Sequence, residues 1–490
     1  MYQNGNCPQD RFDVVVVGGG AAGLLAALAV ADSGATVVLL EKNSEVGGKT
    51  VWSAGLVTAG GTVVQAERRV EDSVDAHRRE ILAHAERTGV LGIPGVSEKL
   101  GLLIDNVADA VDRLAACGVR FGGPHPEEMH SVARGHQFVP GARAAIAALA
   151  QKTAEAGVRI RRDTPVDELI TGPTGSILGV RAGGREIRAN AVILSAGDFS
   201  AAGPGRPAPQ FAEHAYKSWA TGDGQHLAAE AGGDLVGVDS MVFAALITVD
   251  EPLFFAHPHV LAAGAIVVDG TGRRIANETV TFGHGYAERT PHDLYLVVGG
   301  DQLAGVATSA DDGPVGRDGW LRTGKSHLGN FGGVGYAYVD DLLDAGHAVR
   351  GESLDHLAAT LGMDAATLRR EAAEIAKAVG AEDRLGRSWS TDPFANGPFL
   401  AVGPMRGAVA LGAGGIRCDE RMRALDSSGE PIDGLYVAGD CADSAGAGFI
   451  TGGHGYGLGW AFASGLIAGR DAAASTGASA GRPAEAANAG

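Results

Sequence analysis

Three glycines near the amino terminus have the spacing of a phosphate-binding turn. Gly18, Gly20 and Gly23 form the pattern Gly-x-Gly-x-x-Gly. In such a turn the first glycine permits a tight bend, the second lets a pyrophosphate approach the backbone, and the third lets a helix pack closely on a strand. The N–H groups at the start of that helix can then donate to phosphate oxygens. The chemistry that these residues offer is the binding of a dinucleotide.

The elements around the turn decide its interpretation, because 76 of the 490 residues are glycine and the pattern alone is weak. Phe12–Val17 is a short β-branched run, typical of a buried parallel strand. A helix rich in alanine and leucine follows, and Thr36–Glu41 is a second buried strand. Glu41 can accept both ribose hydroxyls of an adenosine and would repel a 2′-phosphate. The sequence predicts a βαβ unit that binds a dinucleotide other than NADP; the alternative is a glycine-rich turn that binds nothing.

Two later segments favour FAD over NAD. Gly47–Thr50 follows the second strand, where an FAD-binding fold needs backbone close to the pyrophosphate and the flavin. Gly434–Asp440 is an apolar strand that ends in Gly-Asp. A carboxylate at Asp440 can hold the ribityl chain, and Gly439 permits the close approach. Asp440 could also cap a helix, and the two roles are compatible.

The bulk properties of the chain exclude several classes of partner. A formal net charge of −18 argues against nucleic acid, which needs a basic face. We predict no signal peptide and no membrane span, because no apolar run approaches roughly 18 residues. The four cysteines are scattered, and His257-Pro258-His259 has no accompanying carboxylate, so we predict neither disulfides nor a metal site. A cytoplasmic setting with reduced cysteines is expected.

The fold class that the pattern predicts is α/β, with one domain inserted into another. Alternation of buried strands and helices is lost from about Val236 and returns at Leu425–Asp440. We therefore predict a Rossmann-like FAD-binding domain, a parallel sheet with helices, interrupted by an α+β substrate-capping domain. The predicted limits are 1–236 for the first part of the FAD-binding domain, 237–396 for the capping domain, 397–475 for the second part and 476–490 for a disordered tail.

Several motifs, in this order, resemble the fumarate reductase and 3-ketosteroid dehydrogenase flavoprotein superfamily, of the FAD-binding oxidoreductase 2 type. The matching stretches are VVVVGGGAAGLLAALAVADSGATVVLLEK, GGKTVWSAG, AVILSAGDF, ATGDGQHLAAEAGGDL, GRRIANE, GGIRCDERMRALDSSGEPIDGLYVAGD and GLGWAFASGLIAG. The resemblance implies an FAD domain with an inserted capping domain and an active site between them. It also implies addition or removal of hydrogen at a C–C bond next to an electron-withdrawing group.

The resemblance extends the expected cofactor site beyond the glycine turn. We expect noncovalent FAD, because no histidine or cysteine occupies a position recognised as an attachment point. The implied cofactor-binding residues are Gly18, Gly20, Ala21, Ala22, Gly23, Glu41, Lys42, Gly48, Lys49, Thr50, Ser53, Ala54, Gly55, Val166, Ala196, Gly197, Gly439, Asp440, Gly455, Gly457 and Leu458.

Departures from the family pattern bear on the substrate. Fumarate reductases place a catalytic Arg five residues after the Asn that matches Asn277, and the position here is Phe282. Their His-Thr-Met is replaced by Leu411–Ala413, and their C-terminal Arg falls near Gly452. A dicarboxylate needs charge-matched, bidentate partners, so fumarate and succinate are not expected. Ketosteroid dehydrogenases have Tyr at the Phe282 position and near Thr451, which counts against steroid Δ1-desaturation as well.

Two polar segments are candidates for catalysis. Tyr286 or His284, directly after the capping-domain motif, is the expected base that takes an acidic α proton. Gly455, whose position in the family polarises a ketone through its backbone amide, is expected to act with Thr451 or His454. The alternative for each histidine or tyrosine is a hydrogen-bonded structural role.

The predicted function is FAD-dependent desaturation of a C–C bond next to a carbonyl, in a cyclic or ketosteroid-like substrate. One alternative is the reverse reaction, an ene-reductase acting on an activated alkene. Another is a flavin-binding redox module without catalysis. The chain has no haem or iron–sulfur motif, so the electron acceptor or donor is expected to be a separate molecule.

Overall fold

The computed structural model describes most of the chain. The described residues are 10–53, 55–87, 89–125, 130–201, 212–214, 219–238, 241–248, 264–278, 293–300, 321–322, 337–412, 414–445 and 455–477. The chain splits into two units. Unit 1 comprises Met1–Gly205, Ser218–Met241 and Leu411–Gly490, and unit 2 comprises Arg206–Lys217 and Val242–Ala410.

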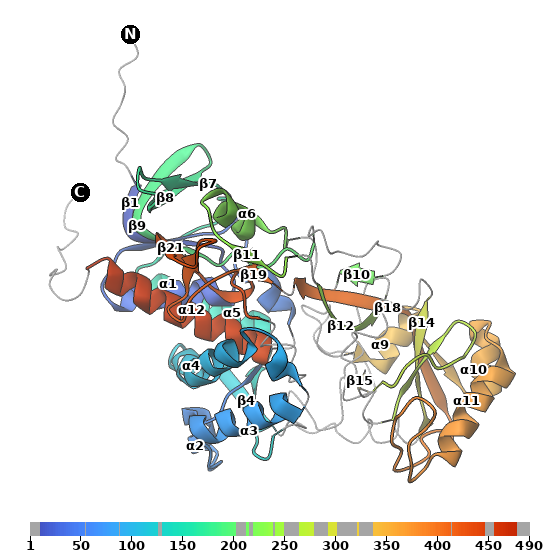
Figure 1. The fold of residues 1–490 in the computed structure, drawn as a ribbon. Coiled ribbons are helices and arrows are strands. Elements are labelled where there is room, and N and C mark those ends of the chain that lie inside the picture. Colours follow the sequence, from blue (N-terminus) through green and yellow to red (C-terminus); the bar gives the residue numbers. More distant parts are fainter. Residues whose placement is uncertain are drawn as a thin grey trace. The chain divides into compact units, whose positions relative to one another are not determined.

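The main sheet of unit 1 contains the strands of the predicted βαβ unit (Figure 1). β1 (Asp10–Val17) lies between β2 (Val37–Leu40) and β9 (Arg185–Leu194) and is parallel to both. β6 (Arg159–Arg161) pairs with β2, and β21 (Pro431–Val437) pairs with β9, again in parallel. The carboxyl ends of these strands therefore meet at one edge of the sheet.

Antiparallel strands complete the sheets of unit 1. The main sheet is extended by β20 (Arg423–Leu425), β8 (Ile177–Ala182) and β7 (Val166–Thr171). A smaller sheet consists of β3 (Leu56–Thr58), β5 (Gly135–Val139) and β4 (Arg120–His125), and β11 (Leu235–Val236) pairs with β19 (Gly415–Ile416).

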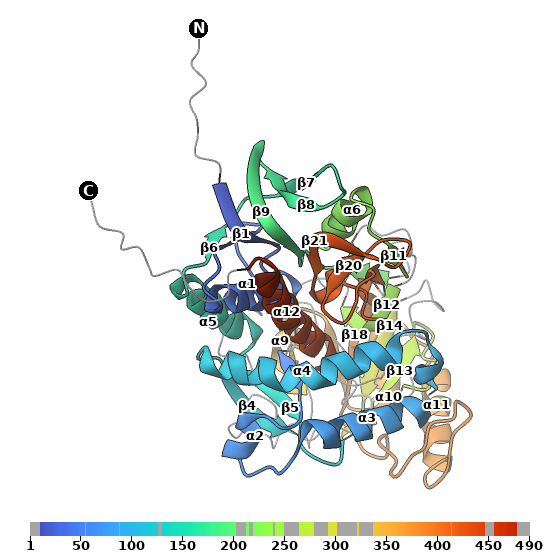
Figure 2. The same ribbon diagram turned by 60° about the vertical axis from the view of Figure 1, so that its left-hand side comes forward.

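Two helices of unit 1 cross at glycines. α1 (Ala21–Asp32) lies against α12 (Tyr456–Ser475), although they come from opposite ends of the chain (Figure 2). A Cβ atom on Gly465 would lie 2.3 Å from the carbonyl oxygen of Ala22. This contact leaves no room for a side chain, so the crossing depends on glycine.

The other helices of unit 1 are short or amphipathic. They are α2 (Val63–Glu67), α3 (Val74–Arg87), α4 (Val96–Ala116), α5 (Ala142–Glu155) and α6 (Asp223–Glu230), with the 3₁₀ turns η1 (Gly48–Trp52), η2 (Val90–Gly92) and η3 (Gly439–Cys441). None of the described helices has the length and hydropathy needed to cross a membrane.

Unit 2 is built on a sheet around one long strand. β18 (Phe399–Gly412) pairs with β14 (Leu294–Val298) and β17 (Ala348–Gly351) in antiparallel fashion. The remaining elements are β10 (Ala212–His214), β12 (Met241–Thr248), β13 (Ile266–Asp269), β15 (Leu321–Arg322), β16 (Ala337–Tyr338), α9 (Val339–Asp344), α10 (Leu354–Leu361) and α11 (Ala365–Lys377).

The GRRIANE segment (Gly272–Glu278) contributes to a buried network of ion pairs in unit 2. Arg274 donates to Glu278 at 2.7 Å and to Asp383 at 2.6 Å, and all three side chains are almost fully buried. Arg387 donates to Glu278 at 2.9 Å and lies 3.9 Å from the centre of the Trp389 ring. Because these buried charges are paired, they fix the packing of unit 2 without leaving an uncompensated ion.

The predicted fold class is confirmed: a parallel, helix-covered sheet is combined with a second, mixed α and β unit. The predicted limits of the capping domain, 237–396, and of the tail, 476–490, stay predictions. Most of the tail lies outside the described residues.

Candidate cofactor site

A cavity of about 110 Å³ opens in unit 1 at the carboxyl ends of β1, β2 and β9. Open α/β sheets bind their ligands at this edge. The structure brings together there many of the residues that the sequence predicts to bind FAD. These are Gly18, Gly20, Ala21, Ala22, Glu41, Lys42, Gly48, Lys49, Thr50, Val166, Ala196, Gly197, Gly439 and Asp440.

The glycine turn has the geometry that its spacing predicts. Gly18 has φ +103°, and a Cβ atom on it would lie 2.5 Å from the carbonyl oxygen of Ser195. A Cβ atom on Gly23 would lie 1.9 Å from the carbonyl oxygen of Gly18. On Gly20, by contrast, the nearest heavy atom would be 4.0 Å away. The turn is therefore packed tightly at its two outer glycines and open at Gly20, which lines the cavity and begins α1 without a side-chain cap.

Glu41 is held on this turn. Its side chain is buried, and one carboxylate oxygen accepts the N–H of Gly19 at 2.7 Å. The other accepts the backbone N–H of Asn43 at 2.8 Å and its side-chain amide at 2.9 Å. A carboxylate offers about four acceptor positions, so Glu41 keeps acceptor capacity for a hydroxyl in the cavity.

A buried ion cluster forms another wall of the cavity. The Lys49 ammonium lies 3.0 Å from a carboxylate oxygen of Asp198 and 3.1 Å from one of Asp440. Burial alone would lower the pKa of Lys49, but the two carboxylates outweigh it and raise that pKa above its usual range. Asp198 also accepts the N–H of Gly412 at 2.6 Å and the hydroxyl of Ser200 at 3.1 Å. Lys49 is therefore fixed as a cation at the cavity wall.

Lys42, Trp219 and Asp223 also line the cavity and are joined by hydrogen bonds. The Lys42 ammonium donates to the carbonyl oxygen of Trp219 at 2.9 Å, to the hydroxyl of Thr221 at 2.8 Å and to Asp223 at 2.8 Å. The rings of Trp219 and Trp52 lie 6.1 Å apart, centre to centre. Lys42 thus ties the end of β2 to the segment that begins α6.

Sequence reasoning missed three of these residues. Asp198 and Asp223 lie within the quoted motifs AVILSAGDF and ATGDGQHLAAEAGGDL, and Trp219 directly precedes the second motif. Their neighbourhood was recognised, but neither their charge nor their aromatic character was assigned a role. The motifs therefore indicated where these residues lie in the chain, but not which contacts their side chains make.

Other predicted cofactor residues do not line the cavity. Gly23 packs against Gly18, as described above. Gly455 begins α12 with φ +78°, and a Cβ atom on it would lie 2.7 Å from the N–H nitrogen of Thr58. The remaining ones are Ser53, Gly55, Gly457 and Leu458. Ala54 and the catalytic candidates His284, Tyr286, Thr451 and His454 lie outside the described residues.

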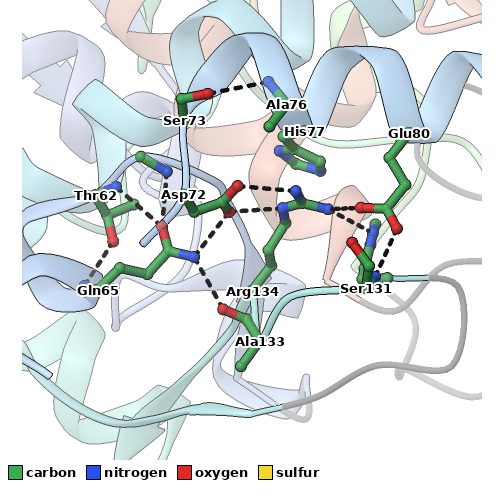
Figure 3. A network of polar contacts seen from close by, with 12 residues as sticks. Thr62, Gln65, Asp72, Ser73, Ala76, His77, Glu80, Ser131, Ala133 and Arg134 are labelled. Atoms are coloured by element: carbon green, nitrogen blue, oxygen red, sulfur yellow. Dashed lines mark hydrogen bonds and ion pairs between the residues drawn. The ribbon is translucent and has the colours of Figure 1, made fainter. Parts of the chain in front are cut away.

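A second polar cluster in unit 1 is centred on Arg134 (Figure 3). Arg134 is 1% exposed and donates twice to Asp72, at 2.7 and 2.9 Å, and also to Glu80. Burial would raise the pKa of both carboxyls, but Arg134 outweighs it and lowers both. Arg134 also contacts His130 at 3.1 Å, and the Tyr456 hydroxyl contacts His130 at 3.1 Å. The first residue of α12 is thereby connected to a buried ion pair.

Two buried histidines accompany this cluster. The Nε2 atom of His77 lies 2.8 Å from the Tyr456 hydroxyl, and burial lowers the pKa of His77 to about 2. His136 contacts the Thr62 hydroxyl at 2.8 Å and the Arg134 carbonyl at 2.7 Å, and burial lowers its pKa to about 4. Both imidazoles are therefore neutral at pH 7. Among the described residues, no group of histidine, cysteine and carboxylate side chains could hold a metal ion.

Comparison with known proteins agrees with the geometry. The FAD binding domain family matches residues 13–458 of the chain. Urocanate reductase of Eggerthella lenta is 26% identical over 455 residues, which cover 88% of this chain and 70% of that protein. The 4-oxocyclohex-2-ene-1-carboxylate 5-dehydrogenase of Sinomonas cyclohexanicum is 27% identical, over 94% of this chain and 93% of its own length.

Solved structures show the same fold. The open conformation of a flavocytochrome c3 fumarate reductase superposes with a TM-score of 0.75 at 23% identity, over 96% of this chain and 79% of that one. The 3-ketosteroid-Δ4-(5α)-dehydrogenase of Rhodococcus jostii RHA1 superposes with a TM-score of 0.66 at 24% identity, over 95% and 97%. The chain therefore belongs to the FAD binding domain family and is an FAD-dependent oxidoreductase of the fumarate reductase and 3-ketosteroid dehydrogenase superfamily.

Proposed function

We propose that the protein is a dehydrogenase that removes two hydrogens from a C–C bond next to a carbonyl group, in a cyclic or ketosteroid-like substrate. Bound FAD supplies the oxidising chemistry by accepting a hydride at N5. The cavity in unit 1 supports FAD as the cofactor. Open backbone at Gly20, acceptor capacity at Glu41 and a fixed cation at Lys49 suit a pyrophosphate joined to sugar-like hydroxyl groups.

One observation supports a carbonyl compound, and not a dicarboxylate, as the substrate. The chain lacks the groups with which fumarate reductases bind a dicarboxylate. Phe282, Leu411 and Gly452 stand at or near the matching positions, and none of them can pair with a carboxylate. An uncharged carbonyl compound requires no such pairing. The relative from Sinomonas cyclohexanicum, which matches over nearly its whole length, is named for dehydrogenation of a cyclic oxo compound.

The chain would contribute a base and an oxygen-binding group. Tyr286 or His284 would take the acidic α proton. The Gly455 backbone N–H, with Thr451 or His454, would donate to the carbonyl oxygen and stabilise the charge that develops on it. Gly455 immediately precedes α12, whose N-terminal end carries a partial positive charge and would add to this stabilisation.

We also propose that FAD is bound without a covalent bond and that electrons leave to a separate acceptor. Attachment needs a nucleophilic side chain at the cofactor. The described residues that line the cavity include no histidine, cysteine or tyrosine. Tight binding then depends on the noncovalent contacts at the turn and at Lys49.

A second candidate function is reduction of an activated alkene. The relatives named as reductases, such as the urocanate reductase, favour this direction. The same base would then act as the acid that protonates the product, and a separate donor would supply the electrons. The remaining alternative, a flavin-binding redox module without catalysis, does not hold because the chain is an oxidoreductase.

An anaerobic titration of the FAD-loaded protein distinguishes these functions. Cyclic ketones, ketosteroids and small dicarboxylates are added while the visible absorption of oxidised flavin is followed. We expect a ketone to bleach the band, and Tyr286→Phe or His284→Gln to slow the bleaching. Bleaching by succinate alone would contradict the proposal. Reoxidation of chemically reduced protein by an enone, without bleaching by any ketone, would establish the reductase instead.

A further inference from the structure

A buried amine and a buried thiol lie in contact in unit 1, away from the cofactor cavity. The Lys99 ammonium donates to the sulfur of Cys418 at 3.1 Å and to the carbonyl oxygen of the same residue at 2.8 Å. Lys99 is 9% exposed and Cys418 6%. Lysine is rarely buried unless it is paired, and here the partners of the ammonium are the sulfur and the carbonyl oxygen of Cys418. The sulfur is thus a direct partner of the lysine nitrogen.

Three segments bring this pair together. Lys99 lies in the first turn of α4, and Cys418 lies between β19 and β20. The Cys418 thiol also contacts the carbonyl oxygen of Asp443 at 3.9 Å. Burial raises the pKa of the Asp443 carboxyl, and the nearby Lys99 charge offsets this only in part. A thiol and an amine therefore share one buried site, next to the backbone of Asp443.

The same site is connected to the cofactor cavity through the backbone. Gly439 and Asp440 line the cavity, and Asp443 follows three residues later. The N–H of Asp443 donates to the carbonyl oxygen of Ile416 at 2.9 Å, two residues before Cys418. Flavins react with dioxygen, and hydrogen peroxide is a common product of that reaction. Cys418 lies outside the cavity lining, but Asp443, whose carbonyl oxygen contacts the Cys418 thiol, is three residues from Asp440 in the chain.

We propose that Lys99 and Cys418 form a reversible covalent cross-link when the protein is exposed to hydrogen peroxide. In the first step the thiol sulfur is oxidised to a sulfenic acid, while the peroxide O–O bond breaks and one water is released. In the second step the amine of Lys99, after losing its proton, attacks the sulfur. An S–N bond forms, the S–O bond breaks, and the hydroxyl leaves as a second water. The product is a sulfenamide, and it has two hydrogens fewer than the reduced protein.

Geometry selects Cys418 over the other described cysteines. Cys441 is buried, burial raises its pKa to about 12, and among the described residues no lysine side chain is hydrogen-bonded to its thiol. Cys117 is half-buried, and burial raises its pKa as well. Burial also raises the pKa of Cys418, so its first oxidation is slow. What distinguishes Cys418 is an amine already in place to trap the sulfenic acid before further oxidation.

The cross-link would join two parts of unit 1 that lie far apart in the sequence. Lys99 and Cys418 are 319 positions apart in sequence. A covalent bond between them closes a long loop in the unfolded chain and stabilises the folded state. Peroxide-treated protein should therefore melt at a higher temperature than untreated protein, and a thiol reductant should reverse the change.

Peptide mapping tests this proposal with the full-length, FAD-loaded protein. The protein is treated with hydrogen peroxide, free thiols are alkylated, and trypsin digests are compared with and without reductant. We expect residues 88–113, uncleaved after Lys99, joined to residues 418–421, with a mass two hydrogens below the sum of the two peptides. Reductant should release both. A cross-linked product heavier by one oxygen atom would be a sulfinamide, formed when a second peroxide transfers an oxygen atom to the sulfenamide sulfur and one water is released; it also supports the site.

Control variants identify the role of the amine. Lys99→Arg keeps the charge but removes the nucleophilic amine, so Cys418 should accumulate as sulfinic acid with no cross-link. Cys117→Ser and Cys441→Ser should leave the cross-link unchanged. Cleavage after Lys99 together with unlinked Cys418 in treated wild-type protein would overturn the proposal. Because peroxide is added directly, this outcome does not depend on which substrate the enzyme uses.

Discussion

At the residue scale, Lys49 is expected to stabilise both the fold and the cofactor site. Replacing it with Met removes the cation between Asp198, which is fully buried, and Asp440. Breaking a buried ion pair on one side costs about 3–5 kcal/mol, because the remaining charge is left uncompensated. We expect Lys49→Met to lower the free energy of unfolding by roughly that amount, measured by urea denaturation, and to weaken FAD binding.

The matched control for Lys49 is an exposed ion pair of the same unit. Arg143 lies 3.6 Å from Glu45, and both side chains are exposed. Arg143→Met should change stability by no more than about 0.5 kcal/mol, since surface pairs contribute little. Equal effects of the two substitutions would contradict the assignment of Lys49 as a buried structural cation.

The neutral histidines predict a pH dependence. The pKa values of His77 and His136, about 2 and about 4, lie below the value of about 6.5 for an unfolded chain. Below about pH 6.5 the unfolded chain therefore binds protons that the folded protein does not. Stability should fall as the pH drops, by about 1.4 kcal/mol per pH unit for each group, down to about pH 4 for His136 and lower for His77.

Urea denaturation between about pH 6 and pH 4.5 checks this prediction. His136→Gln should reduce the slope of unfolding free energy against pH. His226→Gln should not, because that side chain is 75% exposed and its ion pair with Glu230 lies on the surface of the same helix. A wild-type stability that stays flat over this range would count against neutral, buried imidazoles.

At the element scale, the crossing of α1 and α12 should be intolerant of any side chain. A Cβ atom on Gly465 meets the Ala22 carbonyl oxygen at 2.3 Å, and a backbone atom cannot move aside easily. Gly465→Ala should therefore lower the melting temperature, with a destabilisation of about 1–3 kcal/mol. Gly101→Ala in α4 is the control, because the nearest atom there is a flexible arginine at 3.5 Å. It should be neutral or stabilising, since alanine favours helix.

The sequence predicts elements better than it predicts contacts between them. The run Phe12–Val17 and the spacing of Gly18, Gly20 and Gly23 define strand, turn and helix locally, so their roles could be derived before the structure. The pairing of Lys42 with Asp223 joins residues 181 positions apart. Such a contact depends on how whole elements pack, and no period in the sequence encodes it.

At the scale of the whole molecule, the same limit explains why the cluster around Arg134 was not predicted. Arg134 and Asp72 are 62 positions apart, and Tyr456 is connected to Arg134 through His130, which is 326 positions from Tyr456. Composition and motifs identify an FAD-dependent oxidoreductase, because the cofactor site is built around one local turn. Buried polar clusters that support that site require the tertiary structure.

The central claim, that the cavity in unit 1 holds FAD, is tested most directly by Gly20→Val. Gly20 lines the cavity, and its Cβ position has no neighbour closer than 4.0 Å, so a side chain there fills cofactor space without disturbing the fold. FAD affinity is measured by titration calorimetry, and apo-protein stability by urea denaturation. We expect an affinity loss of about a hundredfold or more, near 2.7 kcal/mol, with unchanged apo-protein stability. Wild-type affinity in a folded Gly20→Val protein would contradict this assignment of the site.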